Sequence, residues 1–357
     1  MASMHLETRD APLRSSVKRL VVPDVLRGVA IVAMLIAHAV PMIPDVPRAL
    51  AFVMGNINSL ASPLFALVMG MAAQIVWNRR GGIGRTILQQ SLRGVALIAL
   101  GVWMMTWGSW VAVVLQYLGL LLIVGAPLLL LGTRALIVVT AVIVLASQPI
   151  LEWAGGAVWI YLQPAPVLEV ANWVALGPSY RLVNLLPFFL LGAIVLRRGI
   201  RRDRVLWGMA IIAPIAYLIS MVGARFIDVK SGDYLDTLRD VGLVFAAYVV
   251  VVVIAEMRRV GVARVKDAVF APLSAWGQVA LSLYLLHVAI IAWWVRAFDG
   301  RPHHNELLGW LSVVVLPLIV GWLWWRFVGP GPVEWLLGWV TGRPKRRERR
   351  RRPARQT

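Results

Sequence analysis

Apolar stretches of about 20 residues recur along this chain from Leu20 to Val328, and they constrain its fold more strongly than any other feature. A helix of that length crosses the hydrocarbon core of a bilayer, and the core of a soluble protein of 357 residues does not require so many of them. Hydrophobic residues make up 60% of the chain. The sequence therefore predicts an all-α, polytopic integral membrane bundle.

We expect about ten transmembrane helices, all within one membrane domain. The expected spans are 21–43, 49–77, 86–107, 110–132, 135–152, 181–197, 205–225, 237–257, 274–297 and 307–328. The first span resembles a signal peptide in length, but it contains three ionisable residues and no small-residue cleavage site follows it, so we expect a retained helix. The membrane domain then covers residues 20–328, between an N-terminal tail (1–19) and a C-terminal tail (329–357).

Positive charge is distributed unevenly around these spans. If the N-terminus is cytoplasmic, most of the 36 Lys and Arg residues fall in cytoplasmic segments and only a few in outer segments. This asymmetry follows the positive-inside rule and predicts that both termini are cytoplasmic in a multi-pass protein of the plasma (inner) membrane. The basic tail from Arg343 onward contains a single acid, Glu348, and we expect it to contact anionic lipid headgroups. No aromatic or folded scaffold accompanies this charge, so we expect no nucleic acid partner.

Two ionisable residues of the first span, Arg27 and His38, are separated by ten residues. Eleven steps of about 100° end roughly 20° beyond three full turns, so both side chains lie on nearly the same helix face, about 16 Å apart along the axis. An ionisable side chain inside a bilayer is costly unless it faces a protein interior or a water-filled cavity. We therefore interpret His38 as a candidate general base, with a histidine bonded to a backbone carbonyl as the alternative.

Asp24 lies three residues before Arg27, at ion-pair spacing on a helix. A guanidinium held by this carboxylate in a cavity open to the cytoplasm would suit the phosphate or carbonyl oxygens of an anionic cofactor. We therefore include Asp24 among the candidate catalytic residues and Arg27 among the cofactor-binding ones. The alternative is an arginine whose head group reaches the membrane surface.

Further polar residues occur inside other spans. Asn56 and Asn58 cannot share one helix face, because two steps turn about 200°, and we favour Asn58 as the residue that faces the cavity. Interhelical hydrogen bonding is the alternative for both. Tyr284 and His287 lie within the ninth span, where His287 could complete the site or bridge helices. The chain contains no cysteine, and adjacent histidines in the last outer loop lack a third ligand at diagnostic spacing, so we expect no metal.

The spacing of Arg27 and His38 resembles the arginine-to-histidine motif on the first helix of the acyltransferase-3 superfamily of membrane O-acyltransferases. Other motifs look like the related DUF418 and heparan-alpha-glucosaminide N-acetyltransferase-like families. These motifs are Pro23–Ala30, Pro63–Gly70, Leu115–Gly119, Leu186–Gly192 and Gly277–His287. The likeness runs from about Arg19 to Trp294, and the five motifs occur in the same order.

This resemblance implies transfer of an acyl group, commonly acetyl, from cytoplasmic acetyl-CoA to a hydroxyl or amine of a glycan or lipid-linked acceptor on the outer face. It implies that His38 is the general base or acyl relay and that Arg27 holds CoA. Arg85 and Arg93 are candidates for a paired-arginine motif near the third helix, although their spacing departs from the pattern, and Gln116 is a further cofactor-binding candidate. The lysosomal relatives carry asparagine where this chain has His38, so their mechanism cannot be copied over.

Two other classes of function fit the same residues. Intramembrane His, Arg and Asp also build substrate paths and proton relays, so a transporter or exporter is an alternative, although the two halves of the chain do not mirror each other as in many transporters. A non-catalytic scaffold of the cell envelope is the third class.

Overall fold

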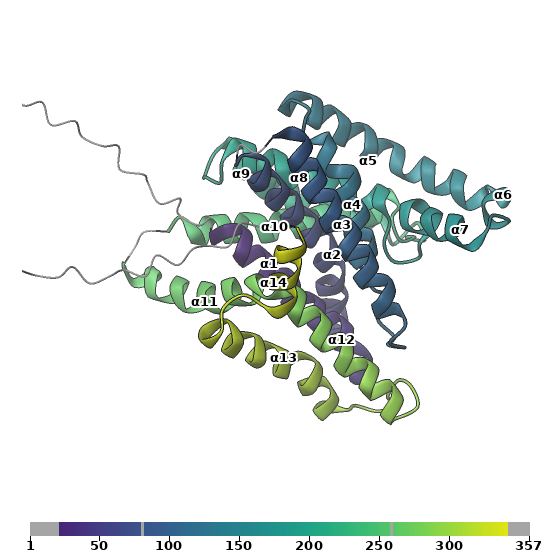
Figure 1. Cartoon of the computed structure of the whole chain (residues 1–357), viewed down its shortest axis with the longest axis vertical. Helices are drawn as coiled ribbons and strands as arrows, with labels where there is room; N and C mark the ends of the chain where they lie inside the picture. Colours follow the sequence, from purple (N-terminus) through teal and green to yellow (C-terminus); the bar gives the residue numbers. More distant parts are fainter. Residues whose placement is uncertain (1–20, 80–81, 258–259, 342–357) are drawn as a thin grey trace, which may run out of the picture.

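The structure is a computed structural model that describes residues 21–79, 82–257 and 260–341. These residues form helices and no strands, which confirms the predicted all-α membrane class (Figure 1). The first half contains α1 (Val21–Ala39), η1 (Val40–Met42), α2 (Arg48–Trp77), α3 (Ile83–Met105), α4 (Leu115–Leu128), α5 (Thr133–Gly156), α6 (Val158–Tyr161), α7 (Ala165–Ala171) and η2 (Asn172–Leu176). The second half contains α8 (Leu182–Arg198), α9 (Arg204–Gly223), α10 (Tyr234–Ala255), α11 (Val260–Gln278), α12 (Ala280–Ala297), α13 (Leu307–Phe327) and α14 (Pro332–Val340).

Eight of the described helices are long and apolar enough to cross a membrane, namely α1 with η1, α2, α3, α5, α9, α10, α12 and α13. The other two predicted spans, α4 and α8, have 14 and 17 residues. At about 1.5 Å per residue they are shorter than a hydrocarbon core of roughly 30 Å. Most of their residues are buried, since α4 packs on α3 and α8 packs between α2 and α5. These two helices form the protein-enclosed centre of the bundle.

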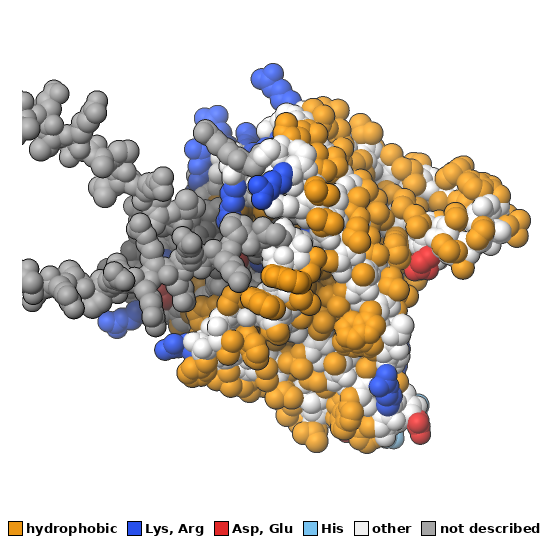
Figure 2. Space-filling model, viewed as in Figure 1, with side chains coloured by type: hydrophobic (Ala, Val, Ile, Leu, Met, Phe, Trp, Pro, Cys, Tyr) orange, Lys and Arg blue, Asp and Glu red, His pale blue; other side chains and the backbone are white. Residues whose placement is uncertain are grey.

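The outer surface of the bundle is apolar, as lipid contact requires. On α5 and α9, Leu145, Ile211 and Leu218 are each more than half exposed. Figure 2 shows hydrophobic side chains over most of the visible face, with many of the Lys and Arg side chains gathered on the left side of the view. A soluble monomer rarely exposes so large a contiguous apolar surface. The basic tail, both chain termini and their expected contacts with anionic lipid lie outside the described residues.

Glycines let two helix pairs at the centre approach closely. A Cβ at Gly28 of α1 would lie 1.9 Å from the carbonyl oxygen of Leu273 on α11, and a Cβ at Gly277 would lie 1.9 Å from that of Asp24. In the same way, a Cβ at Gly70 of α2 would lie 1.8 Å from a carbonyl oxygen of α8, and a Cβ at Gly192 of α8 would lie 1.9 Å from a carbonyl oxygen of α2. Small residues at helix interfaces permit such backbone contact in membranes. The first half of α1 is therefore fixed in position by α11.

The sequence predicted one helix over 274–297, but the structure divides it at Val279 into α11 and α12. Glu334 of α14 explains the division, because its carboxylate accepts hydrogen bonds from the backbone N–H groups of Leu281 (2.7 Å) and Ser282 (3.2 Å) and from the Ser282 hydroxyl. A carboxylate at the first turn satisfies unpaired helix amides and complements the helix dipole. The residues predicted as the start of the C-terminal tail thus include a helix that packs on α12.

Replacing this capping carboxylate tests its contribution. Glu334→Ala is expected to lower the free energy of unfolding by about 1–2 kcal/mol, because the buried N–H groups lose their acceptor. Glu334→Gln keeps one acceptor oxygen and should fall between this variant and wild type. Thermal unfolding in detergent measures both, with Glu306→Ala as the control, since Glu306 is exposed in the loop before α13. Equal unfolding temperatures for Glu334→Ala and Glu306→Ala would contradict the capping role.

Candidate active site

Two histidines from distant parts of the sequence meet inside the bundle. Nδ1 of His38, at the end of α1, lies 2.8 Å from Nε2 of His287 on α12, and the two rings stack with centroids 5.1 Å apart. Nδ1 of His287 lies 3.2 Å from the backbone oxygen of Leu283. Because a carbonyl only accepts, His287 donates from Nδ1, and its Nε2 accepts the proton on Nδ1 of His38 when both rings are neutral. This network leaves Nε2 of His38 with an available lone pair.

The loop between α3 and α4, residues 106–114, is fastened beside this pair. The indole Nε1 of Trp110 donates to the backbone oxygen of His38 (3.0 Å), and the backbone N–H of Val114 donates to the hydroxyl of Tyr284 (3.2 Å). The Tyr284 ring also packs against both imidazoles, with centroid distances of 6.4 Å to His38 and 5.3 Å to His287. The loop is therefore held by the same two helices that carry the histidines.

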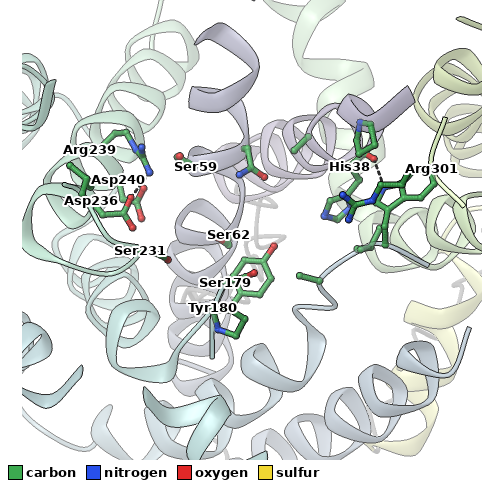
Figure 3. A pocket seen from close by; sticks show the side chains of 18 residues that line it. His38, Ser59, Ser62, Ser179, Tyr180, Ser231, Asp236, Arg239, Asp240 and Arg301 are labelled. Carbon is green, nitrogen blue, oxygen red and sulfur yellow. Dashed lines mark hydrogen bonds and ion pairs between the residues drawn. The ribbon is translucent and has the colours of Figure 1, made fainter. Parts of the chain in front are cut away.

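His38 opens onto a polar cavity of about 530 Å³, a volume within the usual range of small-molecule sites. Figure 3 shows His38 and Arg301 on one side of this cavity and three charged residues of α10 on the other. The polar lining consists of Asn58, Ser59 and Ser62 from α2, Ser179 and Tyr180 before α8, Ser231, Asp236, Arg239 and Asp240 at the start of α10, and Arg301. A base that faces so many hydrogen-bonding groups suits chemistry on a polar substrate.

Tyr180 contributes a hydrogen-bond donor to this lining. Burial raises the pKa of Tyr180 to about 12, with a smaller contribution from Tyr117. The ring of Tyr117 packs edge-on against it, with centroids 5.6 Å apart. The phenol therefore stays protonated at neutral pH and can donate to a bound substrate.

Four of the residues predicted from the sequence come together at this cavity. His38 and Asn58 line it, and Tyr284 and His287 lie against His38. Asn56 is turned away, since its Oδ1 accepts from the hydroxyl of Tyr217 on α9 (2.9 Å). The two asparagines therefore face different neighbours, as the 100° helix step requires.

The remaining predicted residues lie elsewhere. Asp24 and Arg27 form an ion pair (3.7 Å) about three helical turns before His38. Nη1 of Arg27 also lies 3.4 Å from the backbone oxygen of Gly277. In the described part of the chain, Asp24 and Arg27 line neither the cavity beside His38 nor the smaller space of about 40 Å³ next to it. A continuous passage from Arg27 to His38 remains a prediction.

The other cofactor-binding candidates do not line the cavity or the smaller space next to it. Arg85 is exposed near the start of α3, Arg93 is half-buried on the same helix, and Gln116 is buried on α4. Nε2 of Gln116 lies 3.5 Å from the sulfur of Met105. Their binding roles remain predictions.

Sequence reasoning missed the far wall of the cavity. Arg239 and Asp240 fall inside the span predicted at 237–257, and ionisable residues within a span are a sign of function that could have found them. Asp236 and Arg239 form an ion pair on the first turns of α10. Ser179 and Ser231 of the lining carry no such signal, because they lie in loops outside the predicted spans.

Two family models match successive parts of the chain. Residues 19–196 match the family model described as heparan-alpha-glucosaminide N-acetyltransferase, catalytic, and residues 194–344 match the one described as protein of unknown function (DUF418). No curated protein matches the chain. The first match contains His38 and Asn58, and the second contains Asp240 and His287, so the cavity is assembled from both matched segments. The matches support the resemblance to these two families, and the first indicates a membrane protein related to acetyltransferases.

Proposed function

We propose that this chain is an integral-membrane acyltransferase that moves an acyl group, most simply acetyl, from cytoplasmic acyl-CoA to a hydroxyl or amine of an envelope glycan or lipid-linked acceptor. The observation that carries the proposal is the His38–His287 pair at the wall of a polar cavity of about 530 Å³. The match of residues 19–196 to an acetyltransferase catalytic segment supports the choice of transferred group.

The tautomers of the pair suit general base catalysis. Nε2 of His38 accepts the proton of the acceptor hydroxyl while the hydroxyl oxygen forms a bond to the acyl carbon. The bond between that carbon and the thioester sulfur breaks, sulfur keeps the electron pair, and the proton passes from His38 to the leaving thiolate. Throughout, Nδ1 of His38 donates to Nε2 of His287, which holds the ring in the productive orientation, as the third member of a catalytic triad does.

We place the donor at the Arg27 end of α1 and the acceptor in the cavity. Arg27 lies about 16 Å from His38 along the helix axis, so a long thioester substrate with an anionic head would bind there and present its acyl carbon to the histidine. Arg79 and Arg198 are exposed at the inner ends of α2 and α8, and their positive charge would attract an anion. This assignment includes the proposal that both termini face the cytoplasm.

Replacement of His287 tests whether this residue supports catalysis or only folding. His287→Ala is expected to lower kcat for acetyl transfer about 10- to 100-fold, because His38 loses the acceptor that fixes its tautomer. His287→Gln offers a side-chain oxygen to Nδ1 of His38 and should recover part of the rate. Steady-state transfer in nanodiscs measures kcat, and thermal unfolding of the same samples reports folding. A loss of stability without a change in kcat would make His287 a structural bridge.

Reconstitution distinguishes acyl transfer from the two rival functions. Full-length protein in proteoliposomes is supplied with labelled acetyl-CoA outside and an extract of envelope glycans and lipids inside, and we expect label to appear on the enclosed acceptors. Flux of extract components without any donor would indicate a transporter. Absence of acetyl-CoA binding by calorimetry would indicate a non-catalytic scaffold.

A further inference from the structure

The main cavity continues, beyond Asp236 and Asp240, into a small annex between α8 and α10. We name this space the α8–α10 annex, and its volume is about 40 Å³. Its lining adds Arg181, Asn184, Leu185, Phe188 and Thr237 to residues shared with the main cavity, among them Ser62, Ser179 and Asp240. A buried water occupies about 10–15 Å³ on this measure. The annex therefore holds two or three waters or one small substituent of a larger ligand.

Two hydrogen-bond acceptors in the annex lack donors. Oδ1 of Asn184 is buried with no hydrogen-bond partner in the described structure. Its Nδ2 donates to the backbone oxygen of Gly232 (3.0 Å), which fixes the amide orientation, since a flip would set two carbonyl oxygens against each other. The Asp240 carboxylate likewise accepts no hydrogen bond from a described residue. A buried acceptor without a donor is costly, so Asn184 favours a ligand that donates, and the half-buried Asp240 can accept from the same ligand.

The other charged groups of this wall have ion-pair or hydrogen-bond partners, although Nε of Arg239 is buried without one among the described residues. Arg239 pairs with Asp236, whose second oxygen accepts from the backbone N–H of Gly232 (2.7 Å). Nη1 of Arg181 donates to the backbone oxygen of Ser231 (2.7 Å). An anionic substituent would lie against the side chains of Asp236 and Asp240, and a cationic one against Arg181. An uncharged hydroxyl is the donor that both tolerate.

We propose that the α8–α10 annex binds a hydroxyl-bearing substituent of an uncharged polyol acceptor, and that Asp240 and Asn184 thereby determine which other hydroxyl reaches His38. Asp240 and His38 stand on opposite sides of the main cavity (Figure 3), so an acceptor held at one wall presents its far side to the base. This inference rests on the proposed acyl transfer and adds the acceptor class and its orienting residues.

The test uses full-length protein in nanodiscs with three probes: methyl glucoside, methyl xyloside, which lacks the hydroxymethyl group, and methyl glucuronide, which carries a carboxylate. Wild type should acetylate the glucoside with the lowest KM and reject the glucuronide. Asp240→Asn turns a donor toward the ligand and should raise the KM for the glucoside about 10- to 100-fold. The same variant should no longer distinguish glucoside from xyloside. Asn184→Leu should likewise raise the KM for the glucoside and weaken the discrimination between glucoside and xyloside.

Asp228→Asn is the matched control, because Asp228 is exposed in the preceding loop and should behave as wild type. His38-dependent hydrolysis of acetyl-CoA without acceptor should be equal in wild type and Asp228→Asn. An unchanged KM for the glucoside in Asp240→Asn overturns the inference. Efficient acetylation of the glucuronide by wild type also overturns it. So does failure of wild type to acetylate either neutral glycoside while hydrolysis of acetyl-CoA persists. Loss of His38-dependent hydrolysis in wild type would instead overturn the proposed function.

Discussion

His38→Ala should reduce acetyl transfer by about 10²- to 10⁴-fold, the contribution expected of a positioned general base. In the proposed mechanism, Nε2 of this histidine supplies the lone pair that takes the acceptor proton, and none of the other described residues lining the cavity is a histidine. Transfer of labelled acetyl from acetyl-CoA by protein in nanodiscs measures the loss. His304→Ala is the matched control, since His304 is exposed in the loop before α13.

Two further readouts separate chemistry from folding in this variant. Binding of acetyl-CoA should be retained, because His38 lies about three helical turns from Arg27. The unfolding temperature should change little in comparison with the rate, since His38 is half-buried at the cavity wall. Unchanged transfer by a well-folded His38→Ala protein would exclude general base catalysis by this residue.

Gly70→Ala is expected to destabilise the protein by about 1–3 kcal/mol or more, as overpacking does when the surroundings cannot yield. The added methyl would lie 1.8 Å from the carbonyl oxygen of Phe189, a backbone atom of a buried helix. α2 and α8 must therefore separate, and α2 also carries Asn58 and Ser62 of the cavity. Yield of monodisperse protein and thermal unfolding in detergent measure the effect.

Gly208→Ala is the same substitution at a position where we expect the opposite effect on stability. Gly208 lies within α9, and nothing lies within 4 Å of an added Cβ. Alanine in a helix interior is more stable than glycine by roughly 0.5–1 kcal/mol, so this variant should equal or exceed wild type. If both alanine variants unfolded at the same temperature, the close contact of α2 and α8 would be refuted.

Local periodicity was sufficient to predict a helix in each expected span and one face of the cavity, but not α6, α7, α14 or the first part of α11. Each expected span has a helix, and the 100° step favoured Asn58, which lines the cavity, over Asn56, which bonds Tyr217. The break between α11 and α12 was not predictable, because its cause is Glu334, more than 50 residues along the chain. Helix signals read from neighbouring residues do not include a cap that arrives from another helix.

The site could likewise be predicted only as far as local sequence allows. His38 and His287 could each be singled out as intramembrane histidines, but their contact depends on how α1 and α12 pack, with 249 positions between them. Asp240 could be singled out in the same way as an ionisable residue within a span, but its place across the cavity from His38 depends on the packing of α10. Periodicity gives the direction of a side chain from its own helix, and tertiary packing decides what it faces.

The placement of His38 and Asp240 on opposite walls has an evolutionary consequence. The base belongs to α1, held by α11 through backbone contact at Gly28, whereas Asp240 belongs to α10 and to the second of the two matched family segments. In the proposed function, substitutions near the start of α10 would change the acceptor end of the cavity rather than the base itself. We therefore expect that related chains with this function differ in acceptor more readily than in reaction, and that position 240 is one place where they differ.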